Sequence, residues 1–258
     1  MNFSGKGLPL DEIALNDATL LLCVDAASLW SVISVETSGI GFLPDKRPKI
    51  LFERHIFSSQ TGGKHDAQYP EISNSHTGGY GKTGAEEYAR LEKAMALDPH
   101  AALMSASWGL GQIMGFNFKA AGFGSVEEMV SAMTASEGKQ LNAMAKFMIK
   151  TGLFEPLQQK NWAKFAEKYN GPGYAKNRYD EKLAEFYEKY SKGDLPDLSV
   201  RAAQLYLVYL GFDPGPVDGE FGKKTLSALN AFLSREGQAQ VSTLSPAILS
   251  LLENRAET

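Results

Sequence analysis

The carboxyl group of Glu36 is the feature of this sequence that most suggests acid catalysis, because it follows an apolar segment. Leu29, Ile33 and Glu36 are spaced by four and three residues, which places them on one face of a helix. Burial and the negative end of the helix dipole both favour the protonated form of a carboxyl at that position. A carboxylic acid that keeps its proton near neutral pH can protonate a leaving glycosidic oxygen. The alternative is an ordinary solvent-facing Glu at a helix end.

Three short segments in the first 190 residues are informative when they are considered together. They are VETSG at 35–39, SWGLGQIMG at 107–115 and YNGPG at 169–173. In this order and at these separations they resemble segments of goose-type lysozymes and soluble lytic transglycosylases. The run RPKILFERHIF at 47–57 sharpens the match, because it resembles the N-acetylmuramidase family common among endolysins of phages that infect Gram-negative bacteria. The resemblance covers most of residues 10–190 and implies a lysozyme-like enzyme that cuts peptidoglycan.

A second carboxyl group, that of Glu53, lies in a run at 49–57 whose alternating residues predict a strand. Glu53 and His55 would share one face of this strand. Glycoside hydrolysis usually needs a second carboxylate that activates water or stabilises the oxocarbenium-like transition state. Glu53 is our candidate for this role, with His55 beside the substrate. Alternatively, the carboxylate only pairs with a basic neighbour, Arg47, Arg54 or His55, and holds the strand in place.

The resemblance also implies which residues lie along the glycan. Amide side chains at Gln112 and Asn170 can bond N-acetyl groups, and Tyr169 offers a hydroxyl and an apolar ring. Gly109 and Gly111 would let the backbone approach the sugar closely. Structural roles remain open for the three side chains: a helix cap for Gln112, a turn for Asn170 and core packing for Tyr169.

The C-terminal part carries a motif of its own, GPVDGEFGKKT at 215–225. It strongly resembles the turn of the peptidoglycan-binding three-helix module found beside many wall-degrading enzymes, and the match spans most of residues 196–255. The resemblance implies that Asp218, Phe221 and Lys223 contact the wall. The tight turn alone would also require the glycines and Asp218, so a purely structural role stays open.

The elements that must position these groups are mostly helices. An apolar run predicts one buried helix over residues 18–35, capped by Asn16 or Asp17 and ended by residues 37–39. A glycine-rich polar stretch at 58–84 predicts a loop that forms a cleft wall. Further helices are predicted at 85–96, 101–107, 126–135, 139–151, 162–169, 174–190, 200–210 and 223–235, with a last helix opened by Ser245 and Pro246.

These elements predict a mainly α fold with two domains. Residues 1–192 would form an α+β lysozyme-like catalytic domain with a small β element, and residues 196–258 a small three-helix bundle that binds peptidoglycan. The junction between them is a short polar stretch that contains a glycine and a proline.

Composition excludes several other classes of protein. A formal net charge of −4 argues against a nucleic-acid binder, whose affinity depends on many Lys and Arg contacts to phosphate. The single cysteine, Cys23, cannot form an intramolecular disulfide, and its apolar surroundings predict burial. The four histidines are not spaced like a metalloprotease pair, so we expect neither a metal nor a cofactor. A run of about 18 apolar residues, which a membrane span requires, is not found.

The combined interpretation is a monomeric endolysin that cuts between N-acetylmuramic acid and N-acetylglucosamine and causes host lysis. Two alternatives stay open: a lytic transglycosylase that uses Glu36 alone and leaves 1,6-anhydro-muramic ends, and a non-catalytic wall-binding structural protein. Because the N-terminus matches a signal peptide poorly, we expect the protein to stay in the host cytoplasm until a holin-type protein opens the membrane.

Overall fold

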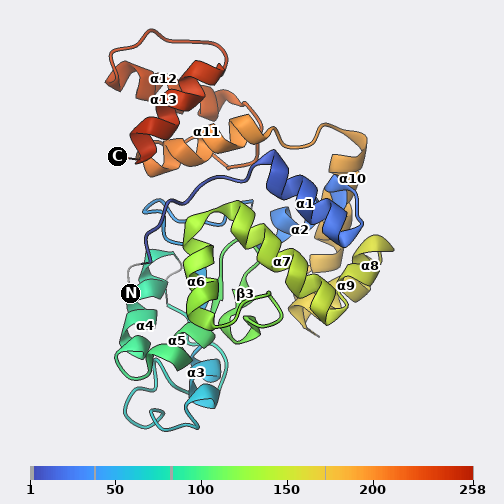
Figure 1. Cartoon of the computed structure of the whole chain (residues 1–258), viewed down its shortest axis with the longest axis vertical. Helices are drawn as coiled ribbons and strands as arrows, with labels where there is room; N and C mark the ends of the chain where they lie inside the picture. Colours follow the sequence, from blue (N-terminus) through green and yellow to red (C-terminus); the bar gives the residue numbers. More distant parts are fainter. Residues whose placement is uncertain (1–2, 38, 82–83, 172, 258) are drawn as a thin grey trace.

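The computed structural model describes residues 3–37, 39–81, 84–171 and 173–257, and its fold is mainly helical with one small sheet (Figure 1). The helices are α1 Glu12–Leu22, α2 Ala26–Thr37, α3 Arg54–Gln60, α4 Ala85–Met95, α5 Pro99–Met104, α6 Val126–Ala135, α7 Glu137–Thr151, α8 Phe154–Gln158, α9 Trp162–Asn170, α10 Tyr179–Lys192, α11 Leu198–Tyr209, α12 Lys223–Arg235 and α13 Pro246–Glu257. Two 3-10 turns, η1 Gly115–Asn117 and η2 Tyr174–Asn177, and three strands, β1 Ile50–Phe52, β2 Ala106–Trp108 and β3 Ile113–Met114, complete the elements. The predicted fold class is therefore confirmed.

The apolar run at 18–35 belongs to two helices, so the prediction of one helix was wrong. α1 and α2 meet at an angle of 107°. Cys23 breaks the run because its backbone is left-handed, with φ 51°, and Asp25 then opens α2 by accepting a hydrogen bond from the Ser28 amide at 2.7 Å. The cap of α1 is Asp11 rather than Asn16 or Asp17. Cys23 is exposed at this bend, which corrects its predicted burial.

The strand predicted at 49–57 is only half present. β1 ends at Phe52, and the residues after Glu53 form α3. Phe52 and Phe57 are both fully buried, with ring centroids 5.9 Å apart. Residues five positions apart point to opposite faces of a strand, so both rings can enter one core only if the chain turns between them. The carbonyl of Glu53 accepts the amides of Ile56 and Phe57 at 3.1 Å each and starts that turn.

The sheet is antiparallel, in the order β1-β2-β3, with Ile50 opposite Trp108 and Ser107 opposite Met114. β2 and β3 were not predicted, and β2 occupies the end of the segment predicted as helix 101–107. Trp108 is fully buried in the core. In this register Glu53, which follows β1, bonds Ser105, whereas the hairpin at 109–112 adjoins Lys49, which precedes β1.

Two separate clusters of buried apolar side chains stabilise the chain. The larger cluster runs from Phe3 to Tyr190, and in it α2 packs against α10 and α1 against α7. The smaller one joins α11, α12 and α13 around Leu207, Phe232 and Leu252. We call these three helices with their connecting turns the C-terminal unit; it lies at one end of the molecule, and α11 is the helix that faces the rest (Figure 1).

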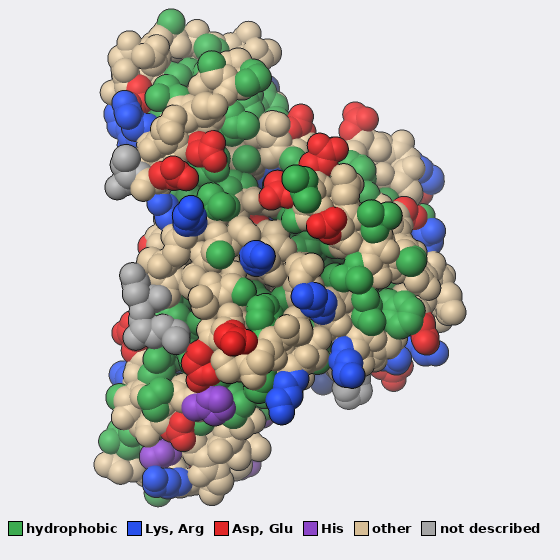
Figure 2. Space-filling view, in the orientation of Figure 1, with side chains coloured by type: hydrophobic (Ala, Val, Ile, Leu, Met, Phe, Trp, Pro, Cys, Tyr) green, Lys and Arg blue, Asp and Glu red, His purple; other side chains and the backbone are tan. Residues whose placement is uncertain are grey.

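Among the described residues no single helix is long and apolar enough to cross a membrane, and only α1 and α2 counted together, across their bend, reach that length and composition. Figure 2 shows Asp and Glu side chains gathered around α1 and Lys and Arg side chains scattered below them. Phosphate-driven binding needs clustered cations, so this face does not resemble a nucleic-acid binding surface.

Candidate active site

Glu36 lies in the last turn of α2, and its side chain is partly buried. This burial raises the pKa of Glu36 to about 7, and a hydrogen bond from Asn170 Nδ2 to Glu36 Oε1, at 3.2 Å, acts in the opposite direction. Near neutral pH the carboxyl is therefore divided between its acid and its carboxylate form. Such a group can both give up and take back a proton, as a catalytic acid must.

Tyr169 and Asn170, at the end of α9, join the other two segments of the sequence pattern to Glu36. The Tyr169 hydroxyl donates a 2.6 Å hydrogen bond to the carbonyl of Gly111, while its ring packs against Phe147 and Phe165. Burial and the negative charge of Glu36 both raise the pKa of this phenol well above its usual range, so it stays a donor. Tyr169 thus packs in the core, as the structural alternative for this residue predicted, and also lies beside the acid.

The amide oxygen of Asn170 is buried and has no hydrogen-bond partner among the described residues. A buried acceptor without a partner is costly unless a ligand satisfies it. It lies on the same amide group that bonds Glu36, so a substrate N–H could be accepted next to the acid. The following Gly171 ends α9 with φ 79°. Two residues of the sequence pattern, Ser38 and Pro172, lie outside the described residues.

Gln112 is held in the hairpin by bonds to its own neighbours. Its Nε2 donates to the Gly109 carbonyl at 2.8 Å and to the Lys49 carbonyl at 3.3 Å, and its Oε1 accepts the Ser107 hydroxyl at 3.0 Å. Gly109 has φ 66°, and a Cβ there would lie 2.6 Å from Gln140. The lack of a side chain at Gly109 thus allows the Gln140 side chain to pack against the backbone, whereas the sequence suggested that a sugar would approach there.

Glu53 forms a second polar group, built on a different element from the one that carries Glu36. The Tyr80 hydroxyl lies 3.0 and 3.1 Å from the two oxygens of Glu53, and His55 Nδ1 lies 3.2 Å from Oε2 without hydrogen-bond alignment. Burial and the negative charge of Glu53 raise the pKa of Tyr80. Arg54 bonds the His76 carbonyl instead, so it is not the partner of Glu53.

Arg47, the other suggested partner of Glu53, pairs with Asp45 at 2.6 Å. Of the three basic residues that the sequence offered, only His55 therefore lies beside the carboxylate. The sequence missed Tyr80, which comes from the loop at 58–84, and Tyr179, whose pKa is raised by burial and by Glu36. Neither tyrosine stands at a spacing from its partner that sequence periodicity could reveal.

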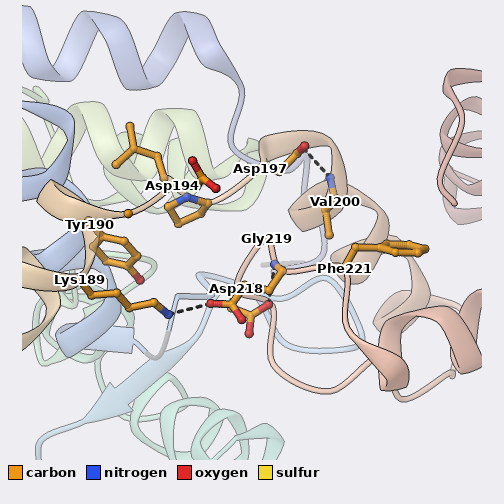
Figure 3. A pocket seen from close by; sticks show the side chains of 12 residues that line it. Lys189, Tyr190, Asp194, Asp197, Val200, Asp218, Gly219 and Phe221 are labelled. Carbon is orange, nitrogen blue, oxygen red and sulfur yellow. Dashed lines mark hydrogen bonds and ion pairs between the residues drawn. The ribbon is translucent and has the colours of Figure 1, made fainter.

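Two of the three residues proposed to contact the wall lie together. Asp218 and Phe221 line a cavity of about 560 Å³ between α10 and the C-terminal unit (Figure 3), whereas Lys223 lies beside a separate groove on α12. Asp218 Oδ1 accepts Gln204 Nε2 and the Glu220 amide, both at 2.9 Å. This carboxylate therefore stabilises the turn, which is the structural role that the sequence left open for Asp218.

Comparison with known proteins adds family evidence to this geometry. The family model described as N-acetylmuramidase matches residues 25–191, and that described as a putative peptidoglycan binding domain matches residues 197–239. Among solved structures, the chain is similar to the crystal structure of the Burkholderia AP3 phage endolysin, with 45% sequence identity, a TM-score of 0.66 and coverage of 71% of each chain. No curated protein matches the chain.

Proposed function

Because the chain belongs to the N-acetylmuramidase family and is a peptidoglycan hydrolase, we propose that it cleaves the bond between N-acetylmuramic acid and N-acetylglucosamine with Glu36 as general acid. The resemblance to phage endolysins with a peptidoglycan-binding module is confirmed. The observation that carries the proposal is the buried Glu36 carboxyl, with a pKa of about 7, at the place where α2, α9 and the hairpin at 109–112 meet.

In the proposed reaction Glu36 protonates the leaving glycosidic oxygen while Glu53 acts as the base for the attacking water. Tyr80 supports this role because its hydroxyl holds the Glu53 carboxylate in one orientation. Asn170 would accept an N–H of an N-acetyl group through its unpartnered oxygen, and Tyr169 would keep Asn170 in place. Gln112 would act mainly by shaping the hairpin, and His55 by facing the substrate beside Glu53.

Product analysis tests the proposed bond and reaction. Peptidoglycan digested with the full chain is reduced and separated, and the fragments are weighed by mass spectrometry. We expect muramic acid at new reducing ends, each with one water added. Predominant 1,6-anhydro-muramic ends would mean that the reaction is transglycosylation and not hydrolysis. Reducing ends on N-acetylglucosamine would refute the proposed bond.

We also propose that residues 1–192 form the catalytic domain and residues 196–258 the wall-binding domain. The two separate clusters of buried apolar side chains support this division. Asp218 and Phe221 would contact the wall from the rim of the junction cavity, and Lys223 from the neighbouring groove. Binding of the full chain to isolated walls should weaken on Phe221→Ala; unchanged binding would remove Phe221 from the interface.

The release route and the monomeric state are further proposals, supported by the likeness to a phage endolysin. The enzyme would stay in the host cytoplasm until a holin-type protein opens the membrane. Cells that express the chain alone should then remain intact and lyse only after the membrane is permeabilised. Lysis without permeabilisation, or a dimer in light scattering, would overturn the respective proposal.

Asn170→Ala is expected to shift the alkaline limb of the pH–rate profile to higher pH. The lost N–H bond favours the charged carboxylate, so its removal raises the pKa of Glu36 above about 7. The lost acceptor should also raise KM for soluble peptidoglycan fragments by roughly threefold to tenfold. Asn161→Ala, at the other end of α9, is the matched control. An unchanged KM would remove Asn170 from the substrate path.

A further inference from the structure

One side chain of the C-terminal unit is fully buried in the larger part of the molecule. Arg201 of α11 reaches across the junction and forms an ion pair with Glu137 at the start of α7. Arg201 Nη1 donates to Glu137 Oε2, and Nη2 donates to Glu137 Oε1 at 2.9 Å. Both side chains are excluded from solvent, so neither charge has water as an alternative partner.

The same guanidinium holds the chain that follows the catalytic acid. Arg201 Nη2 also donates to the carbonyl of Gly39, three residues after Glu36. Glu137 continues the connection, since its Oε1 accepts the Gly41 amide at 2.8 Å. The segment that follows α2 is thus bound by one side chain from each side of the junction.

The turn of the C-terminal unit also packs directly on this segment. A Cβ on Gly39 would lie 3.0 Å from the carbonyl oxygen of Val217, a tighter contact than most side chains make, so the two backbones approach closely here. Gly39 has φ 82°, a conformation that favours glycine. Around this contact the junction is open: the cavity of about 560 Å³ lies on α10, and one of about 280 Å³ is lined by Trp30, Gly39 and Val217.

We propose that Arg201 is a positioning residue for the catalytic acid, through which the wall-binding unit holds the end of α2 and keeps Glu36 in its working place. The inference rests on the proposed role of Glu36. It assigns to the C-terminal unit a second task besides wall binding, because the Gly39 contact would be needed even when the substrate is a soluble fragment.

A purely structural role would have different consequences. A buried ion pair can often be replaced by apolar side chains without loss of stability, whereas removal of one partner leaves an uncompensated charge. The double variant Arg201→Met with Glu137→Gln therefore removes the donor to Gly39 and both charges of the pair, while the Gln amide oxygen can still accept the Gly41 amide. If Arg201 only stabilises the fold, a double variant with wild-type Tm should also have wild-type kcat.

The test measures kcat, KM and Tm of full-length variants with purified soluble peptidoglycan fragments. We expect the double variant to keep a Tm close to that of the wild type and to lose about tenfold or more in kcat, with KM within about twofold, because small displacements of an acid mainly affect the chemical step. Tyr209→Phe is the matched control: it removes another bond from α11 across the junction, 2.8 Å to the Gly7 carbonyl, which is remote in sequence from Glu36. Its kcat should not change.

Arg201→Lys keeps the inference testable if the double variant does not fold. One ammonium group keeps the charge beside Glu137 but cannot reproduce the planar fork that serves the carboxylate and the Gly39 carbonyl together. We expect a loss of about threefold or more in kcat. Wild-type kcat in either folded variant, or a change in KM alone, would overturn the inference. Activity in Glu36→Gln would instead refute the proposed function, so the two failures are distinguishable.

Discussion

Glu36→Gln is expected to lower the rate of wall hydrolysis by at least about 10²- to 10⁴-fold, the usual contribution of a catalytic acid. Gln has nearly the same shape as Glu and can still accept the Asn170 amide, so the fold should be kept. It has no proton to give to the leaving oxygen. The measurement is kcat/KM on isolated peptidoglycan, together with circular dichroism to verify the fold.

The same variant should be more stable than the wild type at alkaline pH. Burial raises the pKa of Glu36 from 4.5 to about 7, so between these values the unfolded chain releases its proton while the folded protein keeps it. The wild type therefore loses stability as pH rises through this window, whereas Gln cannot ionise. The difference in the free energy of unfolding should grow to about 3 kcal/mol at pH 8 and stay below about 1 kcal/mol at pH 5.

Urea denaturation of both proteins at the two pH values measures this difference. A stability gain that is equal at both values would mean that Glu36 has an ordinary pKa and is not poised as an acid. Glu137→Gln is not a suitable control, since it changes the buried pair with Arg201. Glu155→Gln, on the surface helix α8, is suitable and should leave activity and its pH dependence unchanged.

Glu53→Gln is expected to lower activity by about 10²- to 10⁴-fold if Glu53 acts as the base for water. The few products that form should still carry water rather than 1,6-anhydro ends. The assay is hydrolysis of purified peptidoglycan followed by mass spectrometry of the released fragments. Near-wild-type activity in this variant would leave Glu36 as the only catalytic carboxyl and would favour the transglycosylase mechanism.

Tyr80→Phe gives the matched test of how Glu53 is held. It keeps the ring and removes the hydroxyl that donates to the carboxylate and lies 3.0 and 3.1 Å from its two oxygens. A smaller loss than in Glu53→Gln, on the order of tenfold, is expected, because the carboxylate remains but loses its fixed orientation. An equal loss in both variants would instead assign the chemistry to the Glu53–Tyr80 pair as a unit.

The contact of Arg201 with Gly39 also affects how this enzyme should be divided. Removal of the C-terminal unit would take away the guanidinium partner of Glu137 and the donor to the Gly39 carbonyl as well as the wall-binding surface. Loss of activity in a truncated chain would therefore not measure wall binding alone. Point variants in the full-length protein separate the two effects.

The sequence by itself determined the catalytic acid candidate, the family and most of the helices. These features depend on local patterns: the spacing of Leu29, Ile33 and Glu36, the order of the three short segments, and capping residues such as Ser125, which accepts the Glu128 amide at 3.1 Å. Residues close in sequence act on one another in any fold that contains the helix, so such patterns can be interpreted without coordinates.

Tertiary structure alone decided which groups surround each carboxyl. Tyr80 reaches Glu53 over 27 positions, Asn170 reaches Glu36 over 134, and Arg201 reaches Gly39 over 162. It also decided where local signals were ambiguous, as at Cys23 and at the end of β1, because an apolar run is compatible with one helix or two and with a strand or a turn. The conformation that forms is the one that buries Phe52 and Phe57 together in the core. Such tertiary packing cannot be predicted from the periodicity of the sequence.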